Sequence, residues 1–187
     1  MPGLTPVIQS HAAGVALVIT VGAFSVGELW QTARVPRGVS PSHLRGEVLF
    51  RLVFVGAILL LPLGAAVVPG AVIPGGVVAF VVGAVMCWLG LLLRWWCFVT
   101  LGRFFTVVVM TRSDQTVVER GPYRVLRHPS YTGFLLALLG FGVMLGNAVG
   151  SLASCAVVLA ALVHRIRFEE HALVAGLGEA YLAFAER

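Results

Sequence analysis

Long apolar runs alternate with short polar segments along the chain. The runs cover residues 12–30, 48–68, 76–100, 130–146 and 149–167. A helix that crosses a bilayer needs about 20 apolar residues, with some tolerance for shorter runs. The pattern therefore predicts five transmembrane helices. The fourth is short for a full crossing and joins the fifth through a turn at residues 146–150, Gly-Asn-Ala-Val-Gly.

Composition places this pattern in a membrane. Hydrophobic residues make up 59% of the 187 residues and charged residues only 11%, whereas charged residues are about a quarter of a soluble domain. We expect an all-α integral membrane protein with one helical bundle, and we interpret the first run as a retained span and not as a signal peptide. Within this single domain, residues 1–100 hold three helices and residues 101–187 the chemistry.

The arginines predict the orientation. The chain has no lysine, and its 13 basic residues lie in segments 34–51, 94–127 and 165–187, while the loops at 69–75 and 146–150 carry no charge. By the positive-inside rule, this places the protein in the cell membrane with the N-terminus outside and the C-terminus in the cytoplasm.

The net charge of +5 does not indicate nucleic-acid binding. Arginines beside membrane spans set topology and contact anionic lipid headgroups, and no nucleic-acid-binding motif accompanies them. Cys87, Cys97 and Cys155 lie inside apolar runs without a CxxC pattern, so we expect buried thiols and no metal site.

Two polar clusters interrupt the apolar pattern in the second half of the chain. The first covers residues 121–131, directly before the fourth helix, and the second covers residues 165–170, at the end of the fifth. Because the two helices form a hairpin, both clusters should meet on the cytoplasmic side and build one site. Arginines alone could be topology anchors and tyrosines an aromatic belt, but acidic residues contribute little to orientation.

Local patterns add detail to this site. Pro129 should open the fourth helix, which places His128 and Tyr131 at a helix N-terminus. Arg165 and Glu169 are four residues apart and share one helical face. Around them, the β-branched residues at 106–110 and 116–118 predict an extended hairpin in the structured cytoplasmic loop 101–128, and residues 168–187 predict a broken amphipathic helix on the membrane surface.

These residues resemble the isoprenylcysteine carboxyl methyltransferase family and the related phospholipid methyltransferases. The resemblance covers roughly residues 100–187, and the first three helices match only in being helices. It rests on Gly121-Pro122-Tyr123, Arg127-His128-Pro129-Ser130-Tyr131, Arg165-x-x-x-Glu169-Glu170, Leu173, Gly178-Glu179 and Tyr181.

The resemblance implies methyl transfer from S-adenosylmethionine at the cytoplasmic face. It implies that Arg165 binds the substrate and that Arg165 and Glu169 are the catalytic residues. The eukaryotic enzymes usually carry a histidine where Gln115 stands, which changes the hydrogen-bonding rules there. The implied cofactor-binding residues are Gln115, Thr116, Val117, Val118, Tyr123, His128, Pro129, Ser130, Tyr131, Glu169 and Glu170.

Methyl transfer to a carboxylate requires few catalytic groups. An ionised carboxylate needs no general base to accept a methyl group, so alignment is the main requirement, and a guanidinium can hold a carboxylate by two parallel hydrogen bonds. We therefore expect an isoprenoid or lipid-like carboxylate from the bilayer as acceptor. Three alternatives remain: a phospholipid N-methyltransferase, an NADPH-dependent membrane reductase, and a non-enzymatic membrane scaffold.

Overall fold

The structure is a bundle of long helices. It is a computed structural model that describes residues 10–32, 41–105 and 116–186. The α-helices are α1 His11–Thr32, α2 Pro41–Val67, α3 Val77–Leu101, α4 Pro129–Leu145, α5 Ala148–Leu177 and α6 Glu179–Ala185, and a 3₁₀ turn, η3, covers Gly121–Arg124.

Four of these helices, α1, α2, α3 and α5, are long and apolar enough to cross a membrane. The fifth, α4, is apolar but has only 17 residues. The predicted all-α membrane architecture is confirmed, including the short fourth helix.

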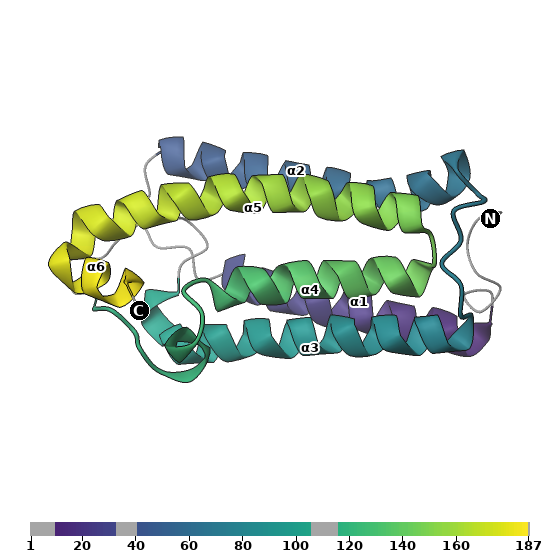
Figure 1. Cartoon of the computed structure of the whole chain (residues 1–187), viewed down its shortest axis with the longest axis horizontal. Coiled ribbons are helices and arrows are strands. Elements are labelled where there is room, and N and C mark those ends of the chain that lie inside the picture. Colours follow the sequence, from purple (N-terminus) through teal and green to yellow (C-terminus); the bar gives the residue numbers. More distant parts are fainter. Residues whose placement is uncertain (1–9, 33–40, 106–115, 187) are drawn as a thin grey trace.

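The helices run side by side along one axis (Figure 1). The closest pairs are α3 with α4 and α2 with α5, while α4 also contacts α5, and α1 rests on α3. Helix α4 begins at the same end of the bundle at which α5 leads into α6. We call this the polar end, because both polar clusters lie there.

Glycines allow α3 and α4 to pack backbone to backbone. A Cβ atom added to Gly90 would lie 2.4 Å from the Gly133 carbonyl oxygen, and one added to Gly140 would lie 2.4 Å from the backbone nitrogen of Cys87. Small residues let membrane helices approach in this way, because their packing energy comes from close contact. The α3–α4 pair also has the most extensive contact of any two helices in the described part of the chain.

The turn between α4 and α5 lies within the predicted residues 146–150 but is shorter, because α5 already begins at Ala148. Gly146 adopts a left-handed conformation with φ of 78° and ends α4. The Asn147 side chain then caps α5 by accepting from Gly150 N at 2.9 Å, and it donates to the Val68 carbonyl at 3.0 Å. The turn thus fixes the hairpin and ties it to the end of α2.

The C-terminal half differs from the prediction in two places. Helix α5 continues to Leu177 instead of ending near residue 167, because the polar residues that follow are compatible with a helix, and the break comes only at Gly178 with φ of 55°. Residues 116–118 form no strand, and residues 106–110, their predicted partner, lie outside the described part of the chain.

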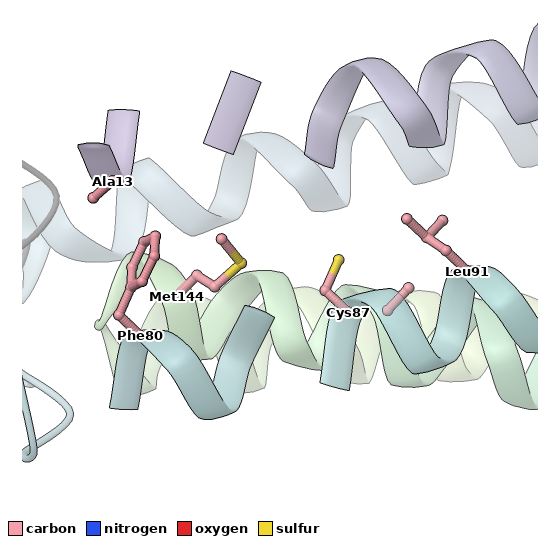
Figure 2. Packing of buried hydrophobic residues seen from close by; sticks show 6 residues of the cluster. Ala13, Phe80, Cys87, Leu91 and Met144 are labelled. Atoms are coloured by element: carbon pink, nitrogen blue, oxygen red, sulfur yellow. The ribbon is translucent and has the colours of Figure 1, made fainter. Parts of the chain in front are cut away.

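Buried apolar side chains form two clusters. One joins α1, α3 and α4 and includes Ala13, Phe80, Cys87, Leu91 and Met144 (Figure 2). The other joins α2, α4 and α5 through residues such as Leu61, Phe134 and Val158. The first cluster fills the bundle away from the polar end.

Candidate active site

A cavity of about 660 Å³ opens at the polar end of the bundle. Its size is in the usual range for a small-molecule site. Its walls come from α1, α2, α3, α4, α5, α6 and the segment before α4, so every helix of the bundle contributes to it.

Most of the predicted site residues line this cavity. They are Thr116, Val117, Val118, Tyr123, His128, Ser130, Tyr131, Arg165 and Glu169. Pro129 is instead buried at the first position of α4. Glu170 contacts Arg127 and His128, which line the cavity. Gln115 lies outside the described residues.

The two polar clusters meet at the start of α4. His128 precedes the first helical residue, and its Nε2 lies 3.2 Å from Oε1 of Glu170. Arg127 Nη1 donates to the same oxygen at 3.1 Å. The His128 ring also stacks on Tyr131, with ring centres 5.8 Å apart. The predicted juxtaposition of residues 121–131 and 165–170 is confirmed.

The Tyr131 hydroxyl joins the two residues expected to carry the chemistry. It donates to Oε2 of Glu169 at 2.5 Å, and Nε of Arg165 donates to it at 3.0 Å. Arg165 and Glu169 are one turn apart on α5. The hydroxyl oxygen of Tyr131, on α4, forms hydrogen bonds with both side chains at the cavity wall. A cationic group and an anionic group are held side by side by a neutral one.

Glu47 of α2 completes the surroundings of Arg165. Nη1 of Arg165 donates to Oε2 of Glu47 at 2.9 Å, and Arg51 donates to the other oxygen of the same carboxylate at 2.7 Å. The Arg165 guanidinium lies over the ring of Phe50, 4.6 Å from its centre. Its position is therefore fixed by charge, by hydrogen bonds and by an aromatic face.

A second guanidinium–carboxylate pair lies across the cavity. Nε and Nη2 of Arg94 donate to the two carboxylate oxygens of Glu28 at 2.6 and 3.0 Å, and Nη1 donates to Oγ of Ser130 at 2.8 Å. Adjacent residues of α4, Ser130 and Tyr131, thus each hold one arginine. Both pairs lie at the same level of the bundle.

The segment before α4 places Tyr123 against α3. Gly121 approaches α3 so closely that an added Cβ atom would lie 2.8 Å from Oγ1 of Thr100, and its φ of 57° also favours glycine. Tyr123 is buried, and this burial, followed by the neighbouring Cys97 thiol, raises the pKa of its hydroxyl above the ordinary value. The hydroxyl is therefore neutral at physiological pH.

Tyr181 of α6 also reaches the cavity. The residue is 5% exposed, and its hydroxyl has no hydrogen-bond partner among the described residues. Burial, followed by the charge of Glu170, raises its pKa to about 12, so it remains a donor at neutral pH. A buried hydroxyl without a partner is costly, which marks this place as suited to a polar ligand.

Functional residues that were not predicted to belong to the site still carry a signal in the sequence. Glu28, Glu47 and Arg94 each stand within or beside an apolar span, where a charged residue is a functional candidate by default. Tyr181 is one of the residues on which the family resemblance rests, but no function was predicted for it. Only the three-dimensional structure pairs Glu28 with Arg94 and Glu47 with Arg165.

The charged and polar side chains of the site indicate which ligands it suits. Among the described residues, no group of three or more His, Cys, Asp or Glu side chains could coordinate an ion. The glutamates and the buried tyrosine hydroxyls suit a polar or cationic ligand at the mouth, and the guanidinium of Arg165 suits an anion deeper in the cavity.

Comparison with known proteins identifies relatives. A model of the isoprenylcysteine carboxyl methyltransferase family matches residues 82–175, half of the chain. Protein-S-isoprenylcysteine O-methyltransferase B of Arabidopsis thaliana is 38% identical over 107 residues, which are 56% of this chain and 54% of that protein. The human protein-S-isoprenylcysteine O-methyltransferase is 35% identical over 109 residues, 57% of this chain and 38% of that protein. The chain thus aligns with about half, or less, of the length of these relatives.

Proposed function

The chain belongs to the isoprenylcysteine carboxyl methyltransferase family, and we propose that it is a membrane enzyme that transfers a methyl group from S-adenosylmethionine to the carboxylate of an isoprenoid or lipid-like acceptor. The observation that carries this proposal is the Tyr131 hydroxyl, which holds Arg165 and Glu169 side by side in one cavity. This arrangement offers an anion site and a cation site at adjacent positions.

The mouth of the cavity fits the proposed methyl donor. When bound, S-adenosylmethionine supplies a methyl group on a positively charged sulfur. The carboxylates of Glu169 and Glu170 would favour its cationic groups, and the unpartnered Tyr181 hydroxyl would donate a hydrogen bond to one of its oxygens. His128 and Tyr131, whose rings stack at this mouth, would form a wall of the donor site.

Arg165 is the proposed clamp for the acceptor. The contact between its guanidinium and the carboxylate of Glu47 supports this role. We propose that the acceptor carboxylate shares or replaces this contact. Because an ionised carboxylate needs no proton removed, Arg165 contributes by alignment and by excluding other orientations.

We also propose the orientation that the arginines predict, with the polar end in the cytoplasm. The arginines of the described chain, Arg45, Arg51, Arg94, Arg103, Arg120, Arg124, Arg127, Arg165 and Arg167, lie toward the polar end of their helices or in the segments there. The water-soluble donor would then enter from the cytoplasm, and the acceptor's apolar part would enter from the bilayer.

A phospholipid N-methyltransferase is the second candidate. The observation that favours it is the pair of acids in the cavity, since Glu28 and Glu47 together with phenylalanine rings would attract a cationic headgroup. Each acid, however, is bound by an arginine. The net charge around the acceptor position is therefore not negative, which favours the carboxylate.

The decisive experiment compares acceptors and donors on the purified protein. Transfer of a radiolabelled methyl group to N-acetyl-S-farnesylcysteine, without transfer to phosphatidylethanolamine, would support the proposal, and the reverse would establish the second candidate. Calorimetry should detect binding of S-adenosylhomocysteine and none of NADPH. Binding of NADPH alone would refute a methyltransferase and favour the reductase, and binding of neither would favour the scaffold.

A further inference from the structure

The cavity continues beyond the two ion pairs as an apolar limb between the helices. Along α1, Glu28, Phe24 and Thr20 are spaced by four residues and line the cavity in that order. This spacing keeps them on one helical face, one turn of about 5.4 Å apart. From the polar end inward, this face of α1 therefore carries a charged side chain, then an aromatic one and then a small one.

Helix α2 presents the same order on its cavity face. Glu47 lies at the polar end, Phe50 and Phe54 follow at the next turns, and Ile58 is the deepest cavity residue on this helix. The helix packs along α5, and α1 rests on α3. Two helices from different parts of the bundle thus form opposite walls with matching layers.

Three phenylalanines from three helices line the limb at one level. The ring centre of Phe54 lies 4.6 Å from that of Phe134 on α4 and 5.6 Å from that of Phe24 on α1. Above this layer, the guanidinium of Arg94 lies over the Phe134 ring at 4.8 Å. The phenylalanines therefore line the cavity at the level between its charged part and its deep part.

The deep part ends on a floor. Its lowest lining residues on α1, α2 and α3 are Thr20, Ile58 and Cys87, and both Thr20 and Cys87 are almost fully buried. Cys87 belongs at the same time to the core cluster with Phe80 and Met144, which fills the space below (Figure 2). The limb therefore has a fixed depth, of the order of two to three helical turns below the ion pairs.

We infer that this floor measures the isoprenoid tail of the acceptor, so that Thr20, Ile58 and Cys87 determine which tail lengths the enzyme accepts. The inference rests on the proposed function for the identity of the occupant. The limb is assigned to the tail because it is continuous with the cavity at Arg165. When the carboxylate of the acceptor is bound at Arg165, the apolar part of the same molecule lies in the limb. The phenylalanine layer holds the tail near the head, and the floor limits its far end.

Ile58 offers substitutions in both directions for the test. Ile58→Phe raises the floor and Ile58→Ala lowers it, and the residue is only partly buried, so the fold tolerates both better than changes at Cys87 would be tolerated. The neighbouring Leu59 is 61% exposed on the outer face of α2. Leu59→Phe and Leu59→Ala are therefore matched controls with the same change in side-chain size.

The probes are N-acetyl-cysteines that carry tails of two, three or four isoprene units. Binding is measured by the rise in unfolding temperature that each probe causes, and methyl transfer is measured separately. We expect Ile58→Phe to lower the preference for the longest over the shortest tail about tenfold and Ile58→Ala to shift it the other way. The Leu59 variants should keep the wild-type ratio, and all variants should bind S-adenosylhomocysteine.

The two readouts separate this inference from the proposed function. If wild-type protein transfers no methyl group but the tail preference in binding shifts with Ile58, the proposed reaction fails and the length-measuring floor stands. If Ile58→Phe and Ile58→Ala bind S-adenosylhomocysteine but keep the wild-type preference, the inference is overturned. Thr20→Leu, which fills the floor from α1, should reproduce the Ile58→Phe shift; an unchanged ratio there also counts against it.

Discussion

The inner pair of helices, α3 and α4, and the outer helices, α1 and α2, differ in how far glycines bring their backbones into contact with neighbouring helices. The inner pair packs through glycines so closely that backbone meets backbone. On α1 and the polar-end half of α2, Gly14, Gly22, Gly46 and Gly56 would accept a Cβ atom without any contact within 4 Å, and α2 meets the backbone of α5 only near its far end, at Gly64 and Gly150. The inner pair, which we call the inner frame, is joined at glycines along much of its length, whereas α1 and the polar-end half of α2 are attached mainly through side chains.

The division also separates the two halves of the site. The family match begins at residue 82 and so covers most of α3, all of α4 and nearly all of α5. The outer helices lie before it, yet they contribute Glu28, Glu47 and the phenylalanines of the apolar limb. We interpret the inner frame as the support of the donor site and the outer helices as the adaptable wall of the acceptor site.

The largest expected effect comes from breaking the inner frame. Gly90→Ala places a Cβ atom against the backbone of α4, which cannot move away without separating the helices, and we expect a loss of about 1–3 kcal/mol in unfolding free energy or failure to fold. Gly22→Ala on α1 is the control and should be neutral or slightly stabilising. Thermal unfolding in detergent measures both; equal stability of the two variants would contradict the comparison.

A large effect on turnover alone is expected from the acceptor clamp. Arg165→Ala should lower methyl transfer about 100-fold or more, because the acceptor carboxylate loses a charge-assisted contact. Affinity for S-adenosylhomocysteine should stay within about threefold. Arg167→Ala, an exposed arginine two residues along α5, serves as control and should keep wild-type turnover. Full activity of Arg165→Ala would exclude its role as clamp.

The outer acids should have smaller and unequal effects. Glu47→Gln removes the negative charge that Arg51 and Arg165 share, whereas Glu28→Gln affects Arg94, which also has Ser130 as a partner. We expect kcat/KM to fall about tenfold for Glu47→Gln and less for Glu28→Gln, since the Glu47 side chain is the more buried. Steady-state kinetics measures kcat/KM for both variants. A larger loss for Glu28→Gln would contradict our inference that the Glu47–Arg165 pair is the more important of the two.

The smallest effect concerns Tyr181 on α6. Tyr181→Phe keeps the ring beside Phe184 and removes only the hydroxyl. We expect the affinity for S-adenosylhomocysteine to fall about three- to tenfold, the usual range for one hydrogen bond. Calorimetry measures it, with Leu182→Ala, an exposed neighbour, as control. An unchanged affinity for Tyr181→Phe would show that the donor does not reach α6.

Sequence analysis predicted the elements whose signals are local. Apolar runs located the helices, Gly146 and Asn147 marked the turn, and the spacing of Arg165 and Glu169 placed both on one face. The sequence predicts a break within residues 168–187, but it could not show that α5 continues unbroken to Gly178, because the polar residues before Gly178 are compatible with either a helix or a loop.

Local sequence patterns also could not predict which charged residues form ion pairs across the bundle. Arg94 and Glu28 are far apart in sequence, and only the packing of α1 on α3 brings them together. The same holds for Arg165 and Glu47 on α5 and α2. A charged residue in an apolar span predicts that a partner exists but does not say which residue it is.

In the proposed function, the Tyr131 hydroxyl would link the two ligand positions thermodynamically. It accepts from Arg165 and donates to Glu169, so a ligand that draws on Glu169 changes the hydrogen bond available to Arg165. Such coupling is reciprocal: the factor by which the donor changes the affinity for the acceptor equals the factor by which the acceptor changes the affinity for the donor. One phenolic proton would thereby make the binding of two chemically unlike molecules cooperative.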